Sequence, residues 1–166
     1  MIKCLFEEDI HKAIKYNIWS STKYGNDLLN DRYKAAVDTN SDVYLFFSCD
    51  SSRIFQGIAK LQSGLDREKV FPLWTNKKNH PGIFSIEWIF IKDVPFFAVK
   101  DIIVPVKDNR SKPVHLFKNT QEIPSIEAKQ LMERFDSYNN TNTILEHFEH
   151  YDIRQENYER MFPNYA

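Results

Sequence analysis

Two tryptophans stand beside residues that cannot form a hydrophobic core around them. Trp19 is followed by three small hydroxylated residues at 20–22, and Trp74 lies in a polar loop with Lys77 and Lys78. An indole in such a setting either turns inward as ordinary core or offers its flat face to a ligand by stacking. The two positions are therefore the first candidates for a binding site.

Sets of residues that could support catalysis or metal binding are weaker. His147 and His150 stand three residues apart in a predicted helix with Glu149 between them, but zinc needs three or four ligands, and Cys4 and Cys49 are far away in sequence. The sequence has no Ser-His-Asp set, phosphate-binding glycine loop or deaminase motif. We therefore predict a binding module rather than an enzyme, with no catalytic residues, no metal and no cofactor.

The composition fits one domain covering residues 1–166. Hydrophobic residues make up 42% of the chain, which is enough for a proper core. The formal net charge is −1, from 22 basic and 23 acidic residues. This balance excludes a strongly basic protein that coats nucleic acid indiscriminately, but it allows a local basic patch.

Cysteine count and hydropathy predict the cellular compartment of the protein. With two cysteines, a disulfide framework is not expected and a reducing compartment is favoured. The sequence shows no secretory leader and no apolar run of about 18 residues, so we expect no membrane association. We expect a cytoplasmic monomer, with the nucleus as the alternative location.

Hydrophobic periodicity predicts the elements that must position these residues. Helices are expected over 7–17, 26–37, 124–138 and 143–162, and strands within 18–22 and over 43–49, 53–61, 83–94, 102–106 and 112–117. This order predicts an α/β fold in which a curved mixed β-sheet forms an open barrel of about six strands surrounded by helices.

Three local details follow from the same patterns. Asn26 is expected to cap the helix at 26–37, and Pro105 confines its strand to an edge or an end. A turn is expected at 50–52. Alternation along 83–94 predicts a single buried face that carries four residues, Phe84, Ile86, Trp88 and Phe90, so that Trp88 is core rather than ligand site.

Several segments, in the same order, resemble the YTH domain, a reader of N6-methyladenosine in RNA. They are "EEDIHKAIKYNIWSSTKYGN", "VYLFFSCDSSRIFQGIAKL", "FSIEWIFIKDVP", "KPV" and "NTQEIPSIEAKQL", and "HFEHYDIRQE" resembles the tail of the family's cytoplasmic branch. The resemblance covers residues 3–156. It implies a pocket for one methylated base of single-stranded mRNA. It also implies a role in mRNA decay or translation, with effector proteins recruited through regions outside this domain.

The resemblance implies an aromatic cage around the methyl group. Its first two walls correspond to Trp19 and Trp74. The third wall, usually Trp, Tyr or Leu, corresponds to His80, which is smaller and more polar. The expected site is an open, dry slot lined by the two indoles.

Other residues enter the expected site by the same resemblance. The backbone carbonyl of Ser20 would accept from the methylated N6–H, and the backbone around Leu5 would approach the N3 side of the adenine. Asp9 would face the N1 edge. Because adenine N1 and an ionised carboxylate are both acceptors, this contact needs a proton or a water, and Asp9→Asn is predicted to tighten binding.

The same resemblance places four further residues near the RNA strand. Asp50 stands where relatives often carry Asn, and Lys118 matches a basic residue that holds phosphate. Lys3 and Lys112 are further candidates for phosphate contact. Because few phosphates would be neutralised, the salt dependence of binding should be shallow.

The expected chemistry separates affinity from selectivity. Stacking contributes about 1–3 kcal/mol per base but hardly distinguishes bases. Burying the methyl adds about 0.8 kcal/mol, and plain adenine would leave an N–H facing an aromatic wall at a cost of roughly 1–3 kcal/mol. The alternatives are a modified-DNA-binding domain of the related barrel superfamily, an enzyme acting on modified nucleic acid, and a protein-interaction domain in which Trp19 is plain core.

Overall fold

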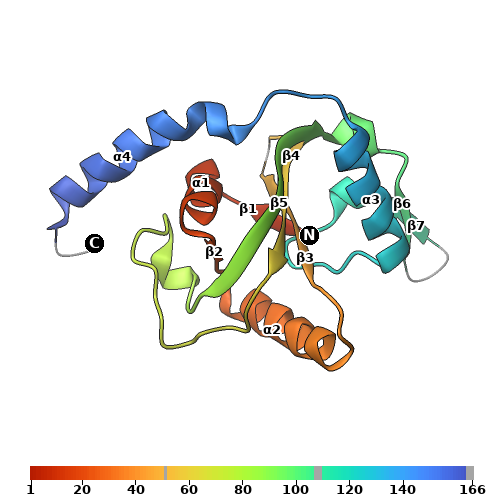
Figure 1. The fold of residues 1–166 in the computed structure, drawn as a ribbon, viewed down its shortest axis with the longest axis horizontal. Helices are drawn as coiled ribbons and strands as arrows, with labels where there is room; N and C mark the ends of the chain where they lie inside the picture. Colours follow the sequence, from red (N-terminus) through yellow and green to blue (C-terminus); the bar gives the residue numbers. More distant parts are fainter. Residues whose placement is uncertain (51, 107–109, 164–166) are drawn as a thin grey trace.

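A curled mixed sheet forms the centre of the protein (Figure 1). The computed structural model describes residues 1–50, 52–106 and 110–163. Five strands pair in the order β1-β3-β4-β5-β2, with β1 and β3 parallel, and β6 and β7 form a separate ladder. The strands are β1 (Ile2–Cys4), β2 (Ile18–Trp19), β3 (Tyr44–Cys49), β4 (Ile54–Leu61), β5 (Phe84–Pro95), β6 (Ile103–Val106) and β7 (Arg110–Pro113). The predicted α/β class and curved sheet are confirmed, although the described strands divide into sheets of five and two.

Helices cover both sides of this sheet (Figure 1). Among the described residues they are α1 (Glu7–Tyr16), α2 (Lys23–Asp38), α3 (Ser125–Ser137) and α4 (Phe148–Met161). The helix predicted over 143–162 divides into a short 3-10 turn, Ile144–His147, and α4. The strand predicted over 112–117 is wrong beyond Pro113, where the chain turns into the 3-10 segment Val114–Leu116.

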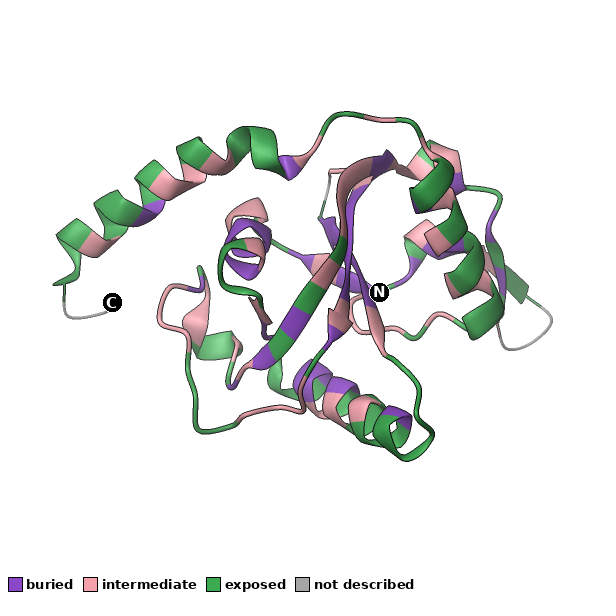
Figure 2. Ribbon diagram, viewed as in Figure 1, coloured by how far each residue is buried: buried purple, intermediate pink, exposed green. Residues whose placement is uncertain are grey.

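Strand β3 contributes to cores on both faces of the sheet, which explains its uninterrupted apolar sequence. Leu45 and Phe47 point into a first core that includes Trp19 and Trp74. Phe46 points into a second core on the opposite face, with α3 and the β6–β7 ladder. Figure 2 shows the central strands buried while the outer sides of α2 and α4 are exposed. The candidate site therefore belongs to the α1–α2 side of the sheet.

Strand β5 changes face halfway along. Ala59 pairs with Trp88 and the adjacent Ile58 pairs with Phe90, so the strand carries an extra residue, Ile89, at a bulge. Phe84, Ile86 and Trp88 consequently pack into the first core, as predicted, whereas Phe90 packs into the second. The prediction of one continuous face is wrong because a bulge inverts the alternation.

Close approach at the bulge depends on a glycine of β4. A Cβ on Gly57 would lie 2.6 Å from the Phe90 carbonyl oxygen and 2.7 Å from the Trp88 ring. The Trp88 indole crosses this position and donates its N–H to the Ala13 carbonyl at 3.2 Å. Trp88 is thus anchored between sheet and α1, in agreement with its predicted core role.

Helix α2 begins three residues earlier than predicted. Thr22 is its N-cap, because the Thr22 hydroxyl accepts from the Gly25 N–H at 3.2 Å. Asn26 therefore lies inside the first turn and is not the cap. The turn expected at 50–52 includes residue 51, which lies outside the described residues.

Polar contacts hold α4 against α1. Asp152 accepts from Lys15 at 2.7 Å and lies 3.0 Å from the buried His11 ring, and Arg154 pairs with Glu8 at 2.6 Å. Burial lowers the pKa of His11. None of the helices in the described part of the chain has the length and apolar character needed to cross a bilayer.

Candidate functional site

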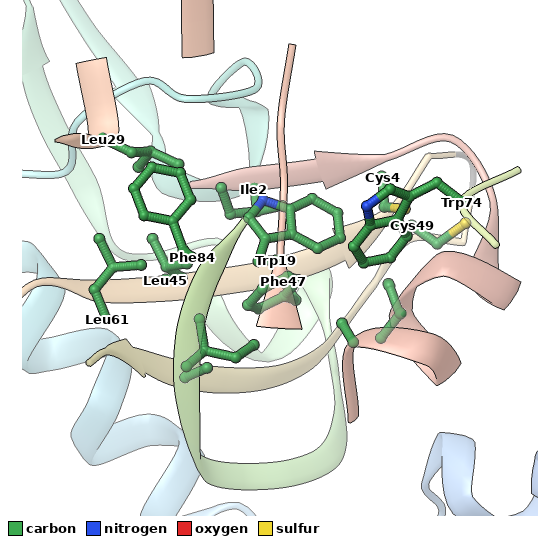
Figure 3. Packing of buried hydrophobic residues seen from close by; sticks show 14 of the residues in the cluster. Ile2, Cys4, Trp19, Leu29, Leu45, Phe47, Cys49, Leu61, Trp74 and Phe84 are labelled. Carbon is green, nitrogen blue, oxygen red and sulfur yellow. The ribbon is translucent and has the colours of Figure 1, made fainter. Parts of the chain in front are cut away.

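Trp19 and Trp74 lie against each other in the first core, and we call them the indole pair. Their ring centroids are 5.7 Å apart with the planes at 72° to each other, an edge-to-face contact. Figure 3 shows the two rings side by side, with Cys4 and Cys49 next to Trp74. Phe47 packs edge-on to Trp19 at 5.0 Å, and Phe71 packs on Trp74 at 5.0 Å.

Main-chain pairing positions Trp19. Helix α1 ends at Asn17, which has a left-handed conformation with φ of 54° that asparagine tolerates well. This residue turns the chain so that Ile18 and Trp19 pair with Ser85 and Phe84 of β5. The backbone of Trp19 is therefore fixed by the sheet itself.

Side-chain hydrogen bonds anchor the segment that carries Trp74. The loop over residues 62–82 is mostly irregular, and its Thr75 donates both its N–H and its hydroxyl to Asp9 Oδ1, each at 2.9 Å. The Lys12 ammonium lies 3.4 Å from the same oxygen and 3.4 Å from the Thr75 hydroxyl. We call Asp9, Lys12 and Thr75 the Asp9 anchor. Asp9 is only 2% exposed, so it acts here as a structural acceptor.

The expected open slot between the indoles is not present. Trp19 is 3% exposed and Trp74 is 4% exposed, so the rings close on each other instead of standing apart as two free walls. Neither indole N–H has a hydrogen-bond partner among the described residues, although both are buried. Leaving a buried donor without a partner costs about 1–3 kcal/mol of folding free energy. Such a donor therefore needs an explanation, for example a bound ligand or water.

His80 and Ser20 lie beside the indole pair. The His80 ring centroid is 6.2 Å from that of Trp74, and Nδ1 lies 2.9 Å from the Asn76 carbonyl oxygen. Because a carbonyl only accepts, His80 Nδ1 is the donor in this contact. Ser20 is 1% exposed, and its hydroxyl lies 3.4 Å from the Pro81 carbonyl oxygen.

Leu5 and Asp50 lie where β1 and β3 end. The side chain of Leu5 is 66% exposed, and its carbonyl oxygen lies 3.8 Å from the Cys49 sulfur. Asp50 is exposed, and its N–H donates to the Cys4 carbonyl at 2.7 Å. Both residues thus form the strand edge next to the cysteines that contact the indole pair.

The structure separates the predicted phosphate-binding lysines. Lys3 points to the face of β1 opposite the first core, where its ammonium lies 4.5 Å from the centre of the Phe96 ring and 3.3 Å from the His115 carbonyl oxygen. Burial lowers the pKa of Lys3. Lys112 lies 5.3 Å from the centre of the Phe117 ring.

Lys118 is exposed, and its loop is hydrogen-bonded to the segment that follows Trp19. Its neighbour Asn119 accepts from the Lys3 N–H at 3.0 Å and donates to the Ser21 hydroxyl at 3.4 Å. The loop that carries Lys118 is therefore tied to the segment immediately after Trp19. Of the lysines predicted to hold phosphate, Lys118 is the one that this connection favours.

Two cavities lie near this half of the molecule. One of about 360 Å³ lies between α1, residues 73–75 and α4, with Lys12, Trp74, Thr75 and Tyr151 among its lining residues. A larger groove of about 720 Å³ runs between α2 and α3 and has no member of the indole pair in its lining. The smaller cavity matters for the site because Trp74 is one of its lining residues.

Sequence reasoning missed three polar residues at the site. Thr75 and Lys12 complete the Asp9 anchor, and Asn26 bridges the segments that follow Trp19 and His80. Asn26 was expected only as a helix cap. The one signal in the sequence that could have indicated Thr75 was its position directly after Trp74, a candidate wall of the cage.

Other candidate chemistry receives no support from the geometry. Burial raises the pKa of the Cys49 thiol to about 11, so this thiol is protonated near neutral pH. Within the described residues, no group of three or more His, Cys, Asp or Glu side chains is placed to hold a metal ion. The buried cysteines therefore act as packing groups beside the indole pair.

Comparisons with known proteins agree on one family. The model of the YTH family, described as the YT521-B-like domain, matches residues 1–136. The chain is 40% identical over 156 residues to YTH domain-containing family protein 2 of Homo sapiens, a match that covers 94% of this chain and 26% of that protein. The chain thus spans about a quarter of the length of the curated relatives it matches.

Solved structures give the same result. The YTH domain of Zygosaccharomyces rouxii MRB1 protein, solved in complex with N6-methyladenosine RNA, has a TM-score of 0.73 and 30% identity, covering 87% of this chain and 88% of that chain. A second YTH domain, solved in complex with m6A, has a TM-score of 0.79 and 26% identity, with the same coverage. These domains therefore share the fold over most of this chain.

Proposed function

Because this chain belongs to the YTH domain family, we propose that it binds single-stranded RNA containing N6-methyladenosine and leaves the RNA chemically unchanged. The observation that carries this proposal is the indole pair, in which two buried rings contact each other while neither N–H has a partner in the described part of the chain. An adenine entering between the rings offers two faces on which an indole can stack. The two solved relatives bound to N6-methyladenosine support the same ligand.

Binding requires the closed indole pair to open. Trp19 is fixed by its pairing with β5, whereas Trp74 lies in an irregular loop held by the Asp9 anchor. The cavity of about 360 Å³ that Trp74 helps to line would give its ring space to move into. We propose that Trp74 moves outward and that the base takes its place against Trp19.

Selectivity arises from the surroundings of the methyl group. Burying it is worth about 0.8 kcal/mol, and plain adenine would face the rings with an extra N–H that lacks an acceptor, at roughly 1–3 kcal/mol. These terms predict a preference of about 30- to 1,000-fold for methylated RNA. The cost of opening is common to both RNAs and therefore cancels in this ratio.

The other predicted residues complete the proposed site. The Ser20 carbonyl would accept from the methylated N6–H, His80 would form the third wall, and Asp9 would face the N1 edge once Thr75 is released. Leu5 and Asp50 would line the strand edge of the pocket.

Phosphate contact is proposed mainly for Lys118, which is exposed on a loop tied to the segment after Trp19. Lys3 would contribute only by leaving its present contacts with Phe96 and His115. Two or three phosphate contacts would give a log–log salt slope of about −1.4 to −2, since each contact to a single strand contributes about −0.7.

The protein that contains this domain would act on mRNA decay or translation from the cytoplasm, with effectors recruited outside the domain and the domain itself monomeric. The match covers only about a quarter of the relatives' length, so those proteins have regions outside the domain in which effector recruitment could lie. Transcriptome-wide crosslinking combined with mRNA half-lives tests it. Bound methylated transcripts with unchanged half-lives and unchanged translation would refute it.

Calorimetry with two oligonucleotides that differ by one methyl group tests the binding proposal. Wild-type protein should prefer the methylated RNA by about 30- to 1,000-fold. Trp74→Ala should weaken methylated RNA binding by about 10- to 100-fold because one stacking wall is lost. Trp88→Phe is the control, since Trp88 lies in the same core but packs on Phe47 and donates its N–H to the Ala13 carbonyl.

Three outcomes would contradict the proposal. Equal affinities for the two RNAs would exclude methyl recognition, and tighter binding of a methylated single-stranded DNA would favour the modified-DNA reading. Recovery of demethylated or cleaved RNA by mass spectrometry would favour an enzyme.

A further inference from the structure

The side chain of Asn26 connects both sides of the candidate site. It is 1% exposed in the first turn of α2. Its Oδ1 accepts from the Ser21 N–H at 2.7 Å, and its Nδ2 donates to the Pro81 carbonyl at 2.6 Å and to the Ser20 hydroxyl at 3.2 Å. One amide thus makes hydrogen bonds to three polar groups.

The partners of Asn26 immediately follow two of the proposed walls. Ser20 and Ser21 come directly after Trp19, and Pro81 comes directly after His80. Asn26 and Pro81 are 55 residues apart in sequence, and no pairing of strands joins Pro81 to the Ser20 segment. In the described chain, the two segments are therefore linked by the hydrogen bonds of the Asn26 amide and by the Ser20 hydroxyl, which lies 3.4 Å from the Pro81 carbonyl oxygen.

Helix α2 is built to bring this amide close. Thr22 caps the helix, and a Cβ on Gly25 would lie 2.5 Å from the Ser21 hydroxyl oxygen and 2.7 Å from Thr120. The glycine thus allows the first helical turn to press against the segment after Trp19. An asparagine one position later presents one acceptor and two donors to that segment, which a carboxylate or a hydroxyl cannot do.

We propose that Asn26 is a positioning residue that fixes the spacing between the Trp19 wall and the His80 side of the site, and thereby sets the preference for the methylated base. This inference rests on the proposed function. If the Pro81 segment is released, the wall around the methyl loosens and water reaches the base edge. Water then satisfies the extra N–H of plain adenine, so the penalty that excludes it falls.

The test compares affinities for the paired oligonucleotides in Asn26→Asp and Asn30→Asp. Aspartate at 26 keeps an acceptor for Ser21 but places a second acceptor opposite the Pro81 carbonyl. Asn30, one turn later in α2, is the matched control because its Oδ1 accepts from Leu65 at 2.9 Å and a carboxylate preserves that bond. Asn26→Asp should lower the methylated-to-unmethylated affinity ratio roughly tenfold, and Asn30→Asp should leave it within about twofold of wild type.

The ratio separates positioning from general stability. A variant that is partly unfolded loses apparent affinity for both RNAs by the same factor, so a purely structural role lowers both affinities and preserves their ratio. Asn26→Ser removes the amide that donates to Pro81 without burying a charge. It is measured in parallel, well below the lowest melting temperature of the set. It should lower the ratio in the same direction.

The outcomes distinguish this inference from the function it rests on. If wild-type protein shows no preference for methylated RNA, the proposed function fails. If wild type shows the preference and a folded Asn26→Asp or Asn26→Ser variant keeps it, the positioning role of Asn26 is overturned and the function stands.

Discussion

The two walls of the indole pair are held in different ways. Trp19 belongs to a strand whose main chain pairs with β5, and its indole packs on Phe47 in the core. Trp74 belongs to an irregular loop, and its neighbour Thr75 is held by side-chain contacts to Asp9. Trp19 is fixed by backbone pairing in the sheet, whereas Trp74 is held through side-chain contacts of its loop. We therefore expect Trp19 to determine selectivity for the methylated base and Trp74 to control entry of the base into the site.

Energies support this division. Opening on the Trp74 side breaks hydrogen bonds to a carboxylate, worth about 1.5–3 kcal/mol each, and an edge-to-face contact of about 0.5–1.5 kcal/mol. Stacking of a base, at about 1–3 kcal/mol, and burial of the methyl group, at about 0.8 kcal/mol, offset that cost. Moving Trp19 would in addition unpair β2 from β5, with no comparable gain.

The largest expected difference between the walls is in stability. Trp19→Ala should abolish measurable preference for methylated RNA and lower the free energy of unfolding by about 3–5 kcal/mol, as for other buried large-to-small changes. Trp74→Ala should weaken binding with a stability loss of about 1–2 kcal/mol, because its loop can collapse into the space. Urea titrations of both variants measure this, and equal losses would break the comparison.

The second prediction concerns the acceptor that holds the loop of Trp74. Asp9→Asn should tighten binding of methylated RNA by about tenfold. A neutral amide weakens the bonds to Thr75 and Lys12, and it can donate to adenine N1 where the carboxylate cannot. Calorimetry measures the change. Unchanged or weaker affinity would remove Asp9 from the pocket and from control of the loop.

A smaller effect is expected from Thr75→Val, which removes one hydroxyl donor to Asp9. Because the closed state is weakened, affinities for methylated and unmethylated RNA should both rise about fivefold, with their ratio unchanged. Paired titrations check both values. Weaker binding of both RNAs would mean that the Thr75 hydroxyl holds Trp74 in its productive position.

The smallest effect tests a region remote from both walls. Burial, with the nearby Glu7 and Glu146 carboxylates, raises the pKa of Asp93 to about 6, and its Oδ1 lacks a partner among the described residues. Asp93→Asn should stabilise the fold by about 1 kcal/mol at pH 7, after allowance for the partial exposure of this side chain. RNA affinity should not change.

The pH dependence of that gain follows from the sign of the shift. The pKa of Asp93 is higher in the folded than in the unfolded protein, so ionising this carboxyl lowers the free energy of unfolding. The loss is complete above about pH 6, where Asp93 is ionised in both states. Below the ordinary pKa of about 4, both states are protonated and the gain should vanish. Melting temperatures of wild type and variant at several pH values measure this, and a gain that persists at pH 3 would contradict it.

Local sequence was sufficient for most elements and insufficient where distant segments decide the geometry. Periodicity predicts α1, β3 and β4, and family resemblance brings Trp19 and Trp74 together. The bulge at Ile89 depends on the register between β4 and β5. The face of the sheet on which Phe90 lies therefore could not be predicted from the sequence of β5 alone. The role of Asn26 depends on Pro81, which lies 55 residues away in sequence.

The closed state of the indole pair was also beyond sequence reasoning. The sequence indicates that Trp19 and Trp74 line one site. Whether the space between their rings is open depends on two opposing free energies, that of the Asp9 anchor, which keeps the pair closed, and that of base stacking, which favours the open pair. Both terms are a few kcal/mol, and neither is visible as a spacing in the chain.

The most direct test of the moving wall uses the three tryptophans of the chain as separate reporters. With 5-fluorotryptophan incorporated, the fluorine NMR spectrum should give resonances for Trp19, Trp74 and Trp88, each assigned by substitution to phenylalanine. On addition of methylated RNA, we predict the largest shift for Trp74, a smaller one for Trp19 and none for Trp88. A saturated complex in which Trp74 keeps its free-state resonance would contradict the account.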